Sequence, residues 1–353
     1  MKKLLIIGMN SVHTYNFIQL IEGYFDEVML ITDSINEKYS GNSRAIDFSV
    51  ANSWRFLSTV SGIKKTVLAF QPSVIHIHQA NTAAWFVLRA IRALQQTSIV
   101  TAWGSDILIN PERGFFYRKM VEQILKNANY FTADARFLAE KMKQLSKNDI
   151  AVEVINFGID PIFKSTKELE TFFPQKENII YSNRLHKKLY RIDHIINAFA
   201  LFSKQNNKAW KLVIAATGVE TENLQQLVHS LGIEKQVAFA GWVNAEENAT
   251  WYRKAKIFVS YPESDATSVS LLEGMSAGCI PLLSDLPANR EWITNHVNGI
   301  VTEQLSANDF QNAMQLCNPQ TAVANIITIQ KKATKALSRK LFLDLYDRAI
   351  AHS

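Results

Sequence analysis

The stretch of sequence with the clearest chemical content is ESDATSVSLLEGMSAG, residues 263–278, which carries three carboxylates and no basic residue. Small and hydroxylated residues follow Asp265 and lead into a pattern typical of a helix. Thr267 or Ser268 suits the N-cap of that helix, and Gly278 suits the position just past its end. The free backbone N–H groups and the positive dipole end of such a helix start form a site for polar or anionic ligand groups.

The three acids of this stretch are Glu263, Asp265 and Glu273. The positions of Asp265 and Glu273 differ in whether their charge needs a ligand as a partner. Asp265 precedes the helix start, where it can stabilise the helix dipole without any ligand. Glu273 lies inside the helix and has no ion-pair partner three or four positions away, where the chain has Val269, Ser270, Ser276 and Ala277. A carboxylate among small and apolar residues is costly unless something donates hydrogen bonds to it. A ligand diol and solvent are equal alternatives for that donor.

The elements that position these acids follow an alternating pattern. Short apolar runs separated by helical stretches occur first at residues 4–8, 28–32, 74–78, 98–103, 130–134 and 152–157. Residues 158–178 break the rhythm with Gly, two Pro and many charges, and the pattern then restarts at 178–182, 211–216, 236–241, 256–261 and 280–284. The alternation predicts parallel βαβ units, and therefore an α/β protein of two Rossmann-like, doubly wound parallel-sheet domains with a cleft between them. Ligands of such sheets bind beyond the carboxyl ends of the strands.

The expected domains are an N-terminal acceptor domain over residues 1–160 and a C-terminal donor domain over residues 161–330. The last segment, 331–353, is expected to be a helix that packs back on the first domain. The terms acceptor and donor depend on the family resemblance described below.

Composition narrows the classes of function. The chain has 353 residues, 47% of them hydrophobic, and a formal net charge of +6, which falls short of the dense Lys/Arg stripe of a nucleic-acid binder. No G-x-G-x-x-G or P-loop pattern occurs, which argues against an NAD-linked dehydrogenase or an ATPase. The two cysteines, Cys279 and Cys317, match no metal-ligand spacing.

The sequence also bears on location. No apolar run has the length of a membrane helix, and the N-terminus lacks the pattern of a signal peptide, so we expect a cytoplasmic protein. Basic and aromatic residues gather in 54–65 and 113–126. These two stretches are interpreted either as a surface for peripheral contact with an anionic membrane or as ordinary solvated surface.

The segment 263–299 resembles the C-terminal signature of glycosyltransferase family 4, whose members are retaining, nucleotide-sugar-dependent enzymes of the GT-B fold. The family pattern has two acids eight positions apart, here Asp265 and Glu273, with a shorter Asp where the family has a Glu. Residues 182–199 look like the family's phosphate-contacting loop and the helix after it. Residues 237–247 are similar to the strand and turn that line its base pocket. The resemblance covers nearly the whole chain.

The resemblance implies roles for individual residues. Glu273 would hold the ribose hydroxyls of the donor, and Asp265 would approach its sugar. Arg184 matches the arginine that neutralises the diphosphate as the sugar–phosphate bond breaks, a task that suits a guanidinium fork. With Asp265 and Arg184, Asp106 completes the catalytic candidates, and a helix-capping role for it stays open. Further donor contacts are expected from Ala266, Thr267, Ser268, Val269, Lys188 and Gly8, although a surface role fits Lys188 equally.

Three further residues are candidates for the acceptor or the cleft: His13, His78 and Trp103. Trp103 stands where the family has a histidine, so that histidine's role does not carry over. His76 is expected to be a hydrogen-bonded core residue.

Taken together, the resemblance implies an enzyme that transfers a hexose-type sugar, with retention, from a UDP- or GDP-linked donor. The implied acceptor is a saccharide or lipid-linked saccharide in surface-glycan biosynthesis, and neither a cofactor nor a metal is expected. A cytoplasmic location, at the inner face of the membrane in one interpretation, fits such an acceptor. Two alternatives remain: a sugar-nucleotide epimerase of the same fold, and a non-catalytic nucleotide-sugar-binding protein.

Overall fold

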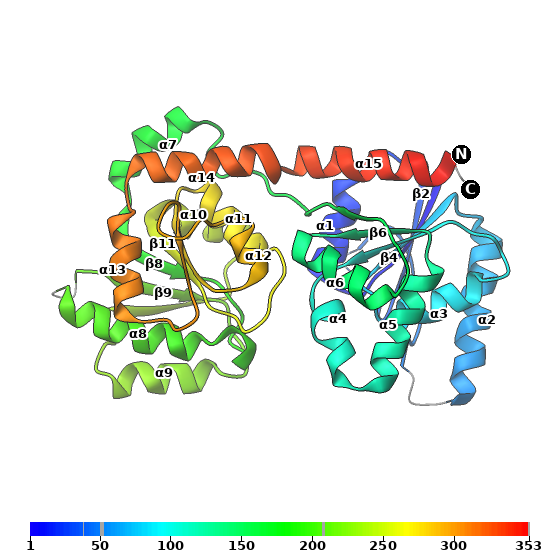
Figure 1. The fold of residues 1–353 in the computed structure, drawn as a ribbon, viewed down its shortest axis with the longest axis horizontal. Coiled ribbons are helices and arrows are strands. Elements are labelled where there is room, and N and C mark those ends of the chain that lie inside the picture. The colour runs from blue at the N-terminus through cyan, green and yellow to red at the C-terminus, as the bar shows by residue number, and fades with distance from the viewer. Residues whose placement is uncertain (38, 50–52, 207–208, 352–353) are drawn as a thin grey trace. The chain divides into compact units, whose positions relative to one another are not determined.

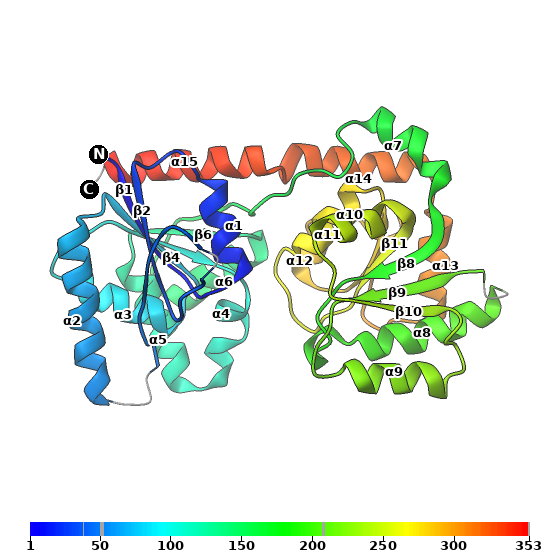
Figure 2. The same ribbon diagram turned by 180° about the vertical axis from the view of Figure 1, so that it is seen from behind.

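The computed structural model describes residues 1–37, 39–49, 53–206 and 209–351. These residues form two compact units: unit 1 contains Met1–Phe157 and Ala336–Ser353, and unit 2 contains Gly158–Lys335. Each unit is built on one parallel sheet with helices on its faces (Figures 1 and 2). The predicted α/β class with two Rossmann-like parallel-sheet domains is confirmed.

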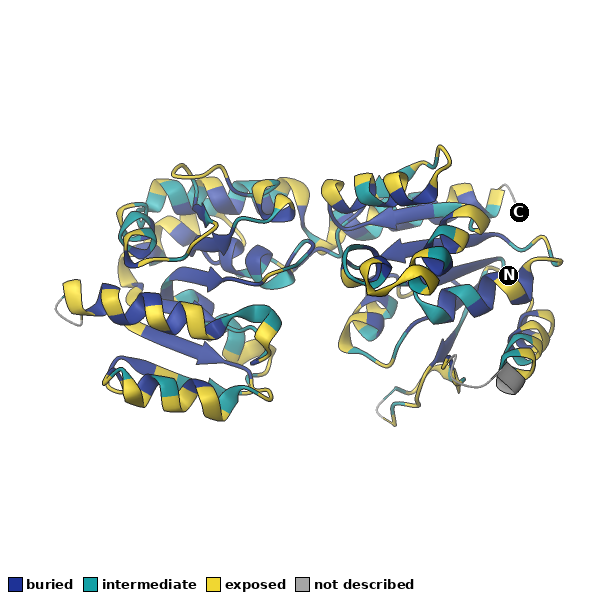
Figure 3. Cartoon of the chain, turned by 60° about the horizontal axis from the view of Figure 1, so that its bottom comes forward, coloured by how far each residue is buried: buried dark blue, intermediate teal, exposed yellow. Residues whose placement is uncertain are grey.

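The sheet of unit 1 has seven strands in the order β3-β2-β1-β4-β5-β6-β7, all parallel. Their bounds are β1 Lys3–Ile7, β2 Glu27–Thr32, β3 Asn42–Ala45, β4 Val74–His78, β5 Ser98–Ala102, β6 Tyr130–Ala133 and β7 Val152–Val154. Strand β3 was not predicted, because its sequence NSRA is mostly polar and only one of its edges pairs with the sheet. Figure 3 shows the central strands buried and the outer faces of the helices exposed.

The helices of unit 1 are α1 Val12–Leu20, α2 Ser53–Phe70, α3 Thr82–Ile91, α4 Ser105–Leu108, α5 Phe115–Asn127, α6 Arg136–Ser146 and α15 Lys335–Ala351. Helices α1 and α15 share one apolar cluster with the strands, in which Phe17 of α1 meets Phe342 of α15 at 4.9 Å between ring centroids. The last helix of the chain is therefore part of the core of the first unit. Helices α2, α3 and α5 lie side by side in both ribbon views.

The sheet of unit 2 has six parallel strands in the order β10-β9-β8-β11-β12-β13. Their bounds are β8 Glu177–Ser182, β9 Lys211–Ala215, β10 Val237–Gly241, β11 Ala255–Ser260, β12 Ile280–Ser284 and β13 Ile300–Thr302. Its helices are α7 Thr166–Phe172, α8 Ile192–Gln205, α9 Thr221–Ser230, α10 Ala245–Lys254, α11 Val269–Ser276, α12 Pro287–Arg290, α13 Ala307–Gln315 and α14 Pro319–Lys332. Strand β13 is too short to have been recognised from its pattern.

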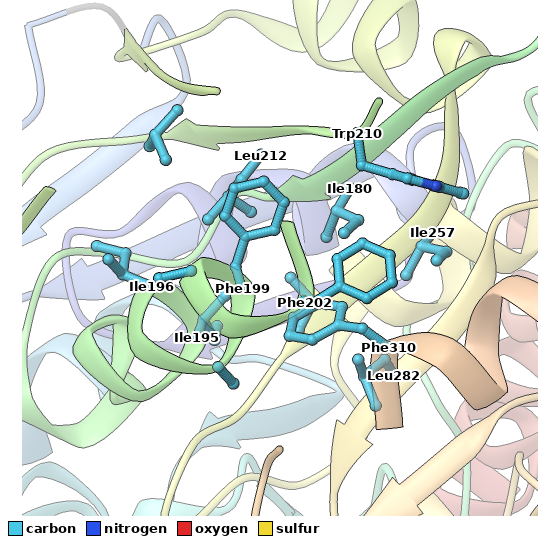
Figure 4. Close-up of a cluster of buried hydrophobic side chains, with 14 of the residues drawn as sticks. Ile180, Ile195, Ile196, Phe199, Phe202, Trp210, Leu212, Ile257, Leu282 and Phe310 are labelled. Atoms are coloured by element: carbon cyan, nitrogen blue, oxygen red, sulfur yellow. The ribbon is translucent and has the colours of Figure 1, made fainter. Parts of the chain in front are cut away.

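The core of unit 2 has two halves. On one face of the sheet, α8, α9 and α13 pack on the strands, and the aromatic rings of Phe199, Phe202 and Phe310 lie over Ile180 and Ile257 (Figure 4). Helices α10, α11 and α14 pack on the other face. Both faces of β8 and β11 are thus covered, which leaves the carboxyl ends of these central strands as the place where polar groups can gather.

Helix α11 ends as the sequence predicts. Gly278, just past its last residue, has φ +72°, a left-handed conformation that side chains other than glycine adopt only with strain. A Cβ at this position would also lie 2.6 Å from Cδ1 of Leu169 in α7. The turn therefore lets α7 approach the α11–β12 connection closely.

Gly278→Ala is expected to lower the stability of the protein by about 1–2 kcal/mol more than Gly232→Ala does. Gly232, in the same unit, has φ +65° with nothing within 4 Å of an added Cβ, so it controls for backbone strain alone. Thermal and urea unfolding of the two variants measure the difference. Equal losses would show that the Leu169 approach costs nothing.

Candidate functional site

Two catalytic candidates meet at the carboxyl edge of the unit 2 sheet. Arg184 follows β8 by two residues, and Asp265 lies in the loop after β11, the strand paired with β8. The Arg184 guanidinium donates from Nη2 to Asp265 Oδ2 at 2.7 Å and from Nη1 to the Ser268 hydroxyl. Its carbon Cζ lies 4.5 Å from the ring centroid of Tyr190. The sequence placed each residue at this edge but did not predict that they bind each other.

Arg184 keeps its charge in this setting. Its side chain is 11% exposed and that of Asp265 is 23% exposed. Burial by itself lowers the pKa of Arg184, but the nearby Asp265 carboxylate and Tyr190 outweigh burial, and the net pKa is raised. The result is a fixed cation, held from three directions at the end of a central strand.

The loop that carries Asp265 is tied to the loop after β8 by further bonds. Arg191 donates from Nε to the carbonyl of Tyr261 at 3.0 Å and from Nη2 to that of Pro262 at 2.9 Å. The backbone N–H of Glu263 donates to the carbonyl of Leu189 at 2.9 Å. These bonds fix the position of the Arg184–Asp265 pair. Sequence reasoning missed Arg191, since nothing local to it indicates partners seventy residues away.

The start of α11 is organised around the same pair. Ser268 is the N-cap residue, but its hydroxyl makes no bond to its own helix and accepts from Arg184 instead. The backbone N–H of Ala266 already donates to Asp265 Oδ1 at 3.0 Å. Thr267 and Val269 continue the chain into the first turn. Of the four backbone groups predicted to face a ligand, the Ala266 N–H is thus engaged by the protein itself.

Glu273 lies on α11 and has a protein partner. Its Oε2 accepts from Nδ2 of Asn248 in α10 at 3.2 Å, and it forms no ion pair within the described residues. Burial raises its pKa, while hydrogen bonds from Tyr252 and Asn248 and the charge of Lys335 oppose the rise. The donor that the sequence could assign only to a ligand or solvent is therefore in part an amide of the neighbouring helix.

Asn248 is the centre of a small polar network that sequence reasoning missed. Its Oδ1 accepts from the Tyr181 hydroxyl at 2.7 Å and from Nδ2 of Asn183 at 3.1 Å. Asn183 also donates to the Tyr252 hydroxyl at 2.9 Å, and its own Oδ1 is buried without a partner among the described residues. Asn183 directly precedes Arg184 at a strand end, and this position was the one available signal.

Unit 1 gathers its candidates at the ends of three adjacent strands, β1, β4 and β5. His78 ends β4, is 1% exposed, and has no hydrogen-bond partner at either ring nitrogen among the described residues. Burial lowers the pKa of His78 to about 3, so the ring is neutral. Its ring centroid lies 5.2 Å from that of Trp103. The ring of the exposed His13 lies edge-on to Trp103, at 5.4 Å between centroids. The Trp103 Nε1 is likewise unpartnered within the described part of the chain.

Asp106 is 2% exposed and binds backbone rather than facing solvent. It accepts from the N–H of Ala80 at 2.7 Å and from that of Trp103 at 3.1 Å. Burial raises its pKa and four backbone N–H groups oppose the rise. With both oxygens occupied, Asp106 joins the loops after β4 and β5, which favours a structural over a substrate-binding role.

Three remaining candidates have local explanations. Gly8 follows β1, and a Cβ there would lie 2.8 Å from the Thr14 side chain of α1, so glycine is needed for packing. Lys188 is exposed and takes no part in the ion pairs of the described residues. Glu263, the third acid of the 263–278 stretch, is exposed on its loop. The core assignment of His76 is confirmed, since it bonds the hydroxyls of Tyr346 and Thr101 at 2.5 and 2.6 Å.

The described residues contain neither a metal-binding cluster nor a membrane-spanning helix. Among the described residues, no group of three or more His, Cys, Asp or Glu side chains is arranged to hold a metal ion. None of the helices described is both long enough and apolar enough to cross a membrane.

Comparison with known families identifies the class of the protein. The model of the family described as glycosyl transferases group 1 matches residues 164–318, and that of the glycosyl transferase 4-like family matches residues 2–135. The chain belongs to the family 4-like glycosyltransferases. The first match contains the Arg184–Asp265 pair and Glu273, and the second contains the strand ends with His78 and Trp103.

Relatives in sequence and structure agree with this assignment. An uncharacterized glycosyltransferase of Methanocaldococcus jannaschii is 31% identical over 109 residues, 31% of this chain and 27% of the relative. The alpha-monoglucosyldiacylglycerol synthase of Streptococcus pneumoniae is 31% identical over 87 residues, 25% of this chain and 20% of the relative. Both matches thus span about a quarter of the relatives' length. Anabaena HepE, solved in complex with UDP, has a TM-score of 0.80 at 14% identity, over 99% of this chain and 100% of that one. This likeness shows the GT-B fold.

The Arg184–Asp265 pair is expected to couple by about 1 kcal/mol in a double-mutant cycle of unfolding with Arg184→Ala and Asp265→Ala. Either single change leaves a partly buried charge without its partner, so the double variant loses less than the two singles together. The exposed pair Lys335–Asp160, with side chains 50% and 79% exposed, is the control and should couple by less than about 0.5 kcal/mol. Additive losses at Arg184 and Asp265 would contradict a coupled pair.

Proposed function

We propose that the protein is a retaining glycosyltransferase that moves a hexose-type sugar from a UDP- or GDP-linked donor to a saccharide or lipid-linked saccharide acceptor. We place it in surface-glycan biosynthesis, in the cytoplasm at the inner face of the membrane. The observation that carries this proposal is the Arg184 guanidinium, charged and held between Asp265, Ser268 and Tyr190 at the edge of the unit 2 sheet. Its support from relatives is the family match, together with the UDP complex of the structural neighbour HepE.

In this proposal the donor is held by unit 2. Glu273 accepts hydrogen bonds from the ribose hydroxyls, for which a carboxylate with one oxygen engaged by Asn248 still has lone pairs. The base lies against the segment 237–247. The polar network around Asn248 keeps the Glu273 carboxylate oriented, so the ribose meets a group already in place.

Catalysis in the proposal depends on charge and position. As the bond between sugar and diphosphate breaks, negative charge grows on the leaving group, and a fixed guanidinium stabilises it without reorganising. Asp265 orients Arg184 and approaches the hydroxyls of the donor sugar. Retention follows if the acceptor attacks on the face from which the diphosphate departs. Because Arg184 supplies the positive charge, we propose that the reaction needs no metal.

The acceptor in the proposal is bound by unit 1, where the candidate rings of His78 and Trp103 are neutral. His78 carries no charge because burial keeps its pKa at about 3, and the partly exposed Trp103 offers an aromatic face. The accessible part of the Trp103 ring suits the apolar face of a sugar, and the buried His78 packs behind it at 5.2 Å between ring centroids. An acceptor that contains a lipid is supported by one relative, an alpha-monoglucosyldiacylglycerol synthase, whose named product is a glucosylated diacylglycerol.

The proposal is tested with UDP, GDP and a panel of their sugars. Thermal shifts in the presence of EDTA identify the nucleotide, since a ligand that binds the folded state stabilises it. Radiolabelled transfer to lipid-extracted and oligosaccharide acceptors then measures turnover and anomeric configuration. Transfer with retention supports the proposal. Interconversion of the donor without an acceptor would identify an epimerase, and binding without turnover on any donor would identify a binding protein.

Glu273→Ala is expected to weaken nucleotide affinity by about 10- to 100-fold, because a hydrogen bond to a charged group contributes about 1.5–3 kcal/mol. The wild-type affinity should also fall as the pH is lowered through the raised pKa of Glu273. Binding requires the carboxylate, so affinity rises with pH up to that pKa and is constant above it. Calorimetric titration across pH measures both effects.

Glu273→Gln is the matched variant for the pH effect and should bind with little pH dependence in that interval. Glu263→Ala removes an exposed acid ten residues earlier and should leave affinity unchanged. Unaltered nucleotide affinity in a folded Glu273→Ala protein would rule out the ribose assignment.

A further inference from the structure

An exposed apolar surface lies where the N-terminal ends of α2, α3 and α5 meet. Phe56 of α2 contacts Trp85 of α3 at 5.4 Å between ring centroids, and Trp85 contacts Phe116 of α5 at 6.0 Å. Phe115 is 78% exposed, Leu57 72% and Phe116 48%. We call these five residues the aromatic edge. Large apolar side chains this exposed, and brought together from three helices, indicate a binding surface.

The charge of the protein is concentrated on the same helices. Residues 53–127 contain nine Lys or Arg and three Asp or Glu, a net charge of +6, which equals that of the whole chain. The remaining residues are therefore balanced. One of the three acids, Asp106, is buried, and Glu122 is paired with Lys119 and Lys147. Helix α2 contains no acid at all.

Two cations, Arg89 and Lys119, lie beside rings of the aromatic edge, and two more are exposed on α2. Arg89 is 4.1 Å from the Trp85 ring centroid and 5.6 Å from that of Phe56. Lys119 lies 5.6 Å from the ring of Phe115. Lys64 and Lys65 are exposed on α2. Apolar side chains that enter an acyl layer, with cations beside them that reach phosphate, form the pattern of an interfacial membrane surface.

We propose that the aromatic edge and its surrounding cations dock the protein on an anionic lipid bilayer. Charge complementarity decides against a second copy of the chain, because self-association would bring two surfaces of the same positive charge together. The cations are distributed over three helices around apolar rings and do not form the continuous stripe that tracks a nucleic-acid backbone. The two stretches singled out in the sequence, 54–65 and 113–126, both contribute residues to this surface. The side chains of Trp54 and Arg55, in the first stretch, lie outside the described residues.

The biological purpose of docking rests on the proposed function, because a lipid-linked acceptor would be presented at a membrane surface. The binding itself is measured without turnover. Full-length protein is sedimented with vesicles of phosphatidylcholine alone and of phosphatidylcholine with phosphatidylglycerol. We expect binding to the anionic vesicles and little to the neutral ones.

Two double variants locate the surface: Phe115→Ser with Phe116→Ser, and Lys64→Glu with Lys65→Glu. Each is expected to lower the partition coefficient on anionic vesicles tenfold or more. The controls are Leu201→Ser, an exposed apolar residue of unit 2, and Lys211→Glu with Lys235→Glu, an equal change of charge in unit 2. The controls should bind as wild type does. Thermal unfolding confirms that every variant is folded.

The outcomes separate docking from sugar transfer. Wild-type protein that ignores anionic vesicles, or variants of the edge that bind as well as the controls, would overturn the docking proposal even if transfer is observed. Conversely, docking that depends on the edge stands if the donor panel fails. Self-association or oligonucleotide binding lost in the edge variants, without vesicle binding, would assign the surface to a different partner.

Discussion

The ion pair between Arg184 and Asp265 is the interaction on which the candidate site depends. It joins loops from two strands that are neighbours in the sheet but distant in the chain, and it recruits the hydroxyl of Ser268 from the start of the next helix. A cation of this kind is costly to bury alone, so each partner both stabilises it and restricts where it points. Such an arrangement fixes the orientation of the Arg184 guanidinium more than it adds to the free energy of unfolding.

The two units present different electrostatics at the carboxyl edges of their sheets. In unit 2 the edge holds a paired cation and a carboxylate whose pKa is raised by burial. In unit 1 it holds a neutral imidazole, an indole and a carboxylate already occupied by backbone groups. In the proposed function, unit 2 holds the charged diphosphate of the donor, and Arg184 is the cation of that unit that lies at the strand ends.

The predictable part of the structure was the part governed by local pattern. Apolar runs identified most strands, because buried parallel strands are continuously hydrophobic, whereas β3 and β13 were missed because one is polar and the other has three residues. The helix start after a strand pointed to Asp265, and the family resemblance added Arg184 and Glu273. The partners of these side chains were not predictable. Asn248 reaches Glu273, and Arg184 reaches Asp265, only because separate strands and helices come together in the folded unit. Asp106 is a similar case. Its position was compatible with a ligand contact or with a helix cap, and in the structure its carboxylate accepts from backbone N–H groups of two loops.

The C-terminal helix α15 has a consequence for how the protein is made. Phe342, Leu345 and Tyr346 are fully buried in unit 1, and the Tyr346 hydroxyl bonds His76 in the middle of its sheet. During synthesis the first unit therefore waits for the segment that begins at Ala336, while unit 2 is continuous from Gly158 to Lys335 and is complete earlier. The usual order in which domains mature along a nascent chain is reversed. Until α15 arrives, the apolar face that it covers is open to chaperones.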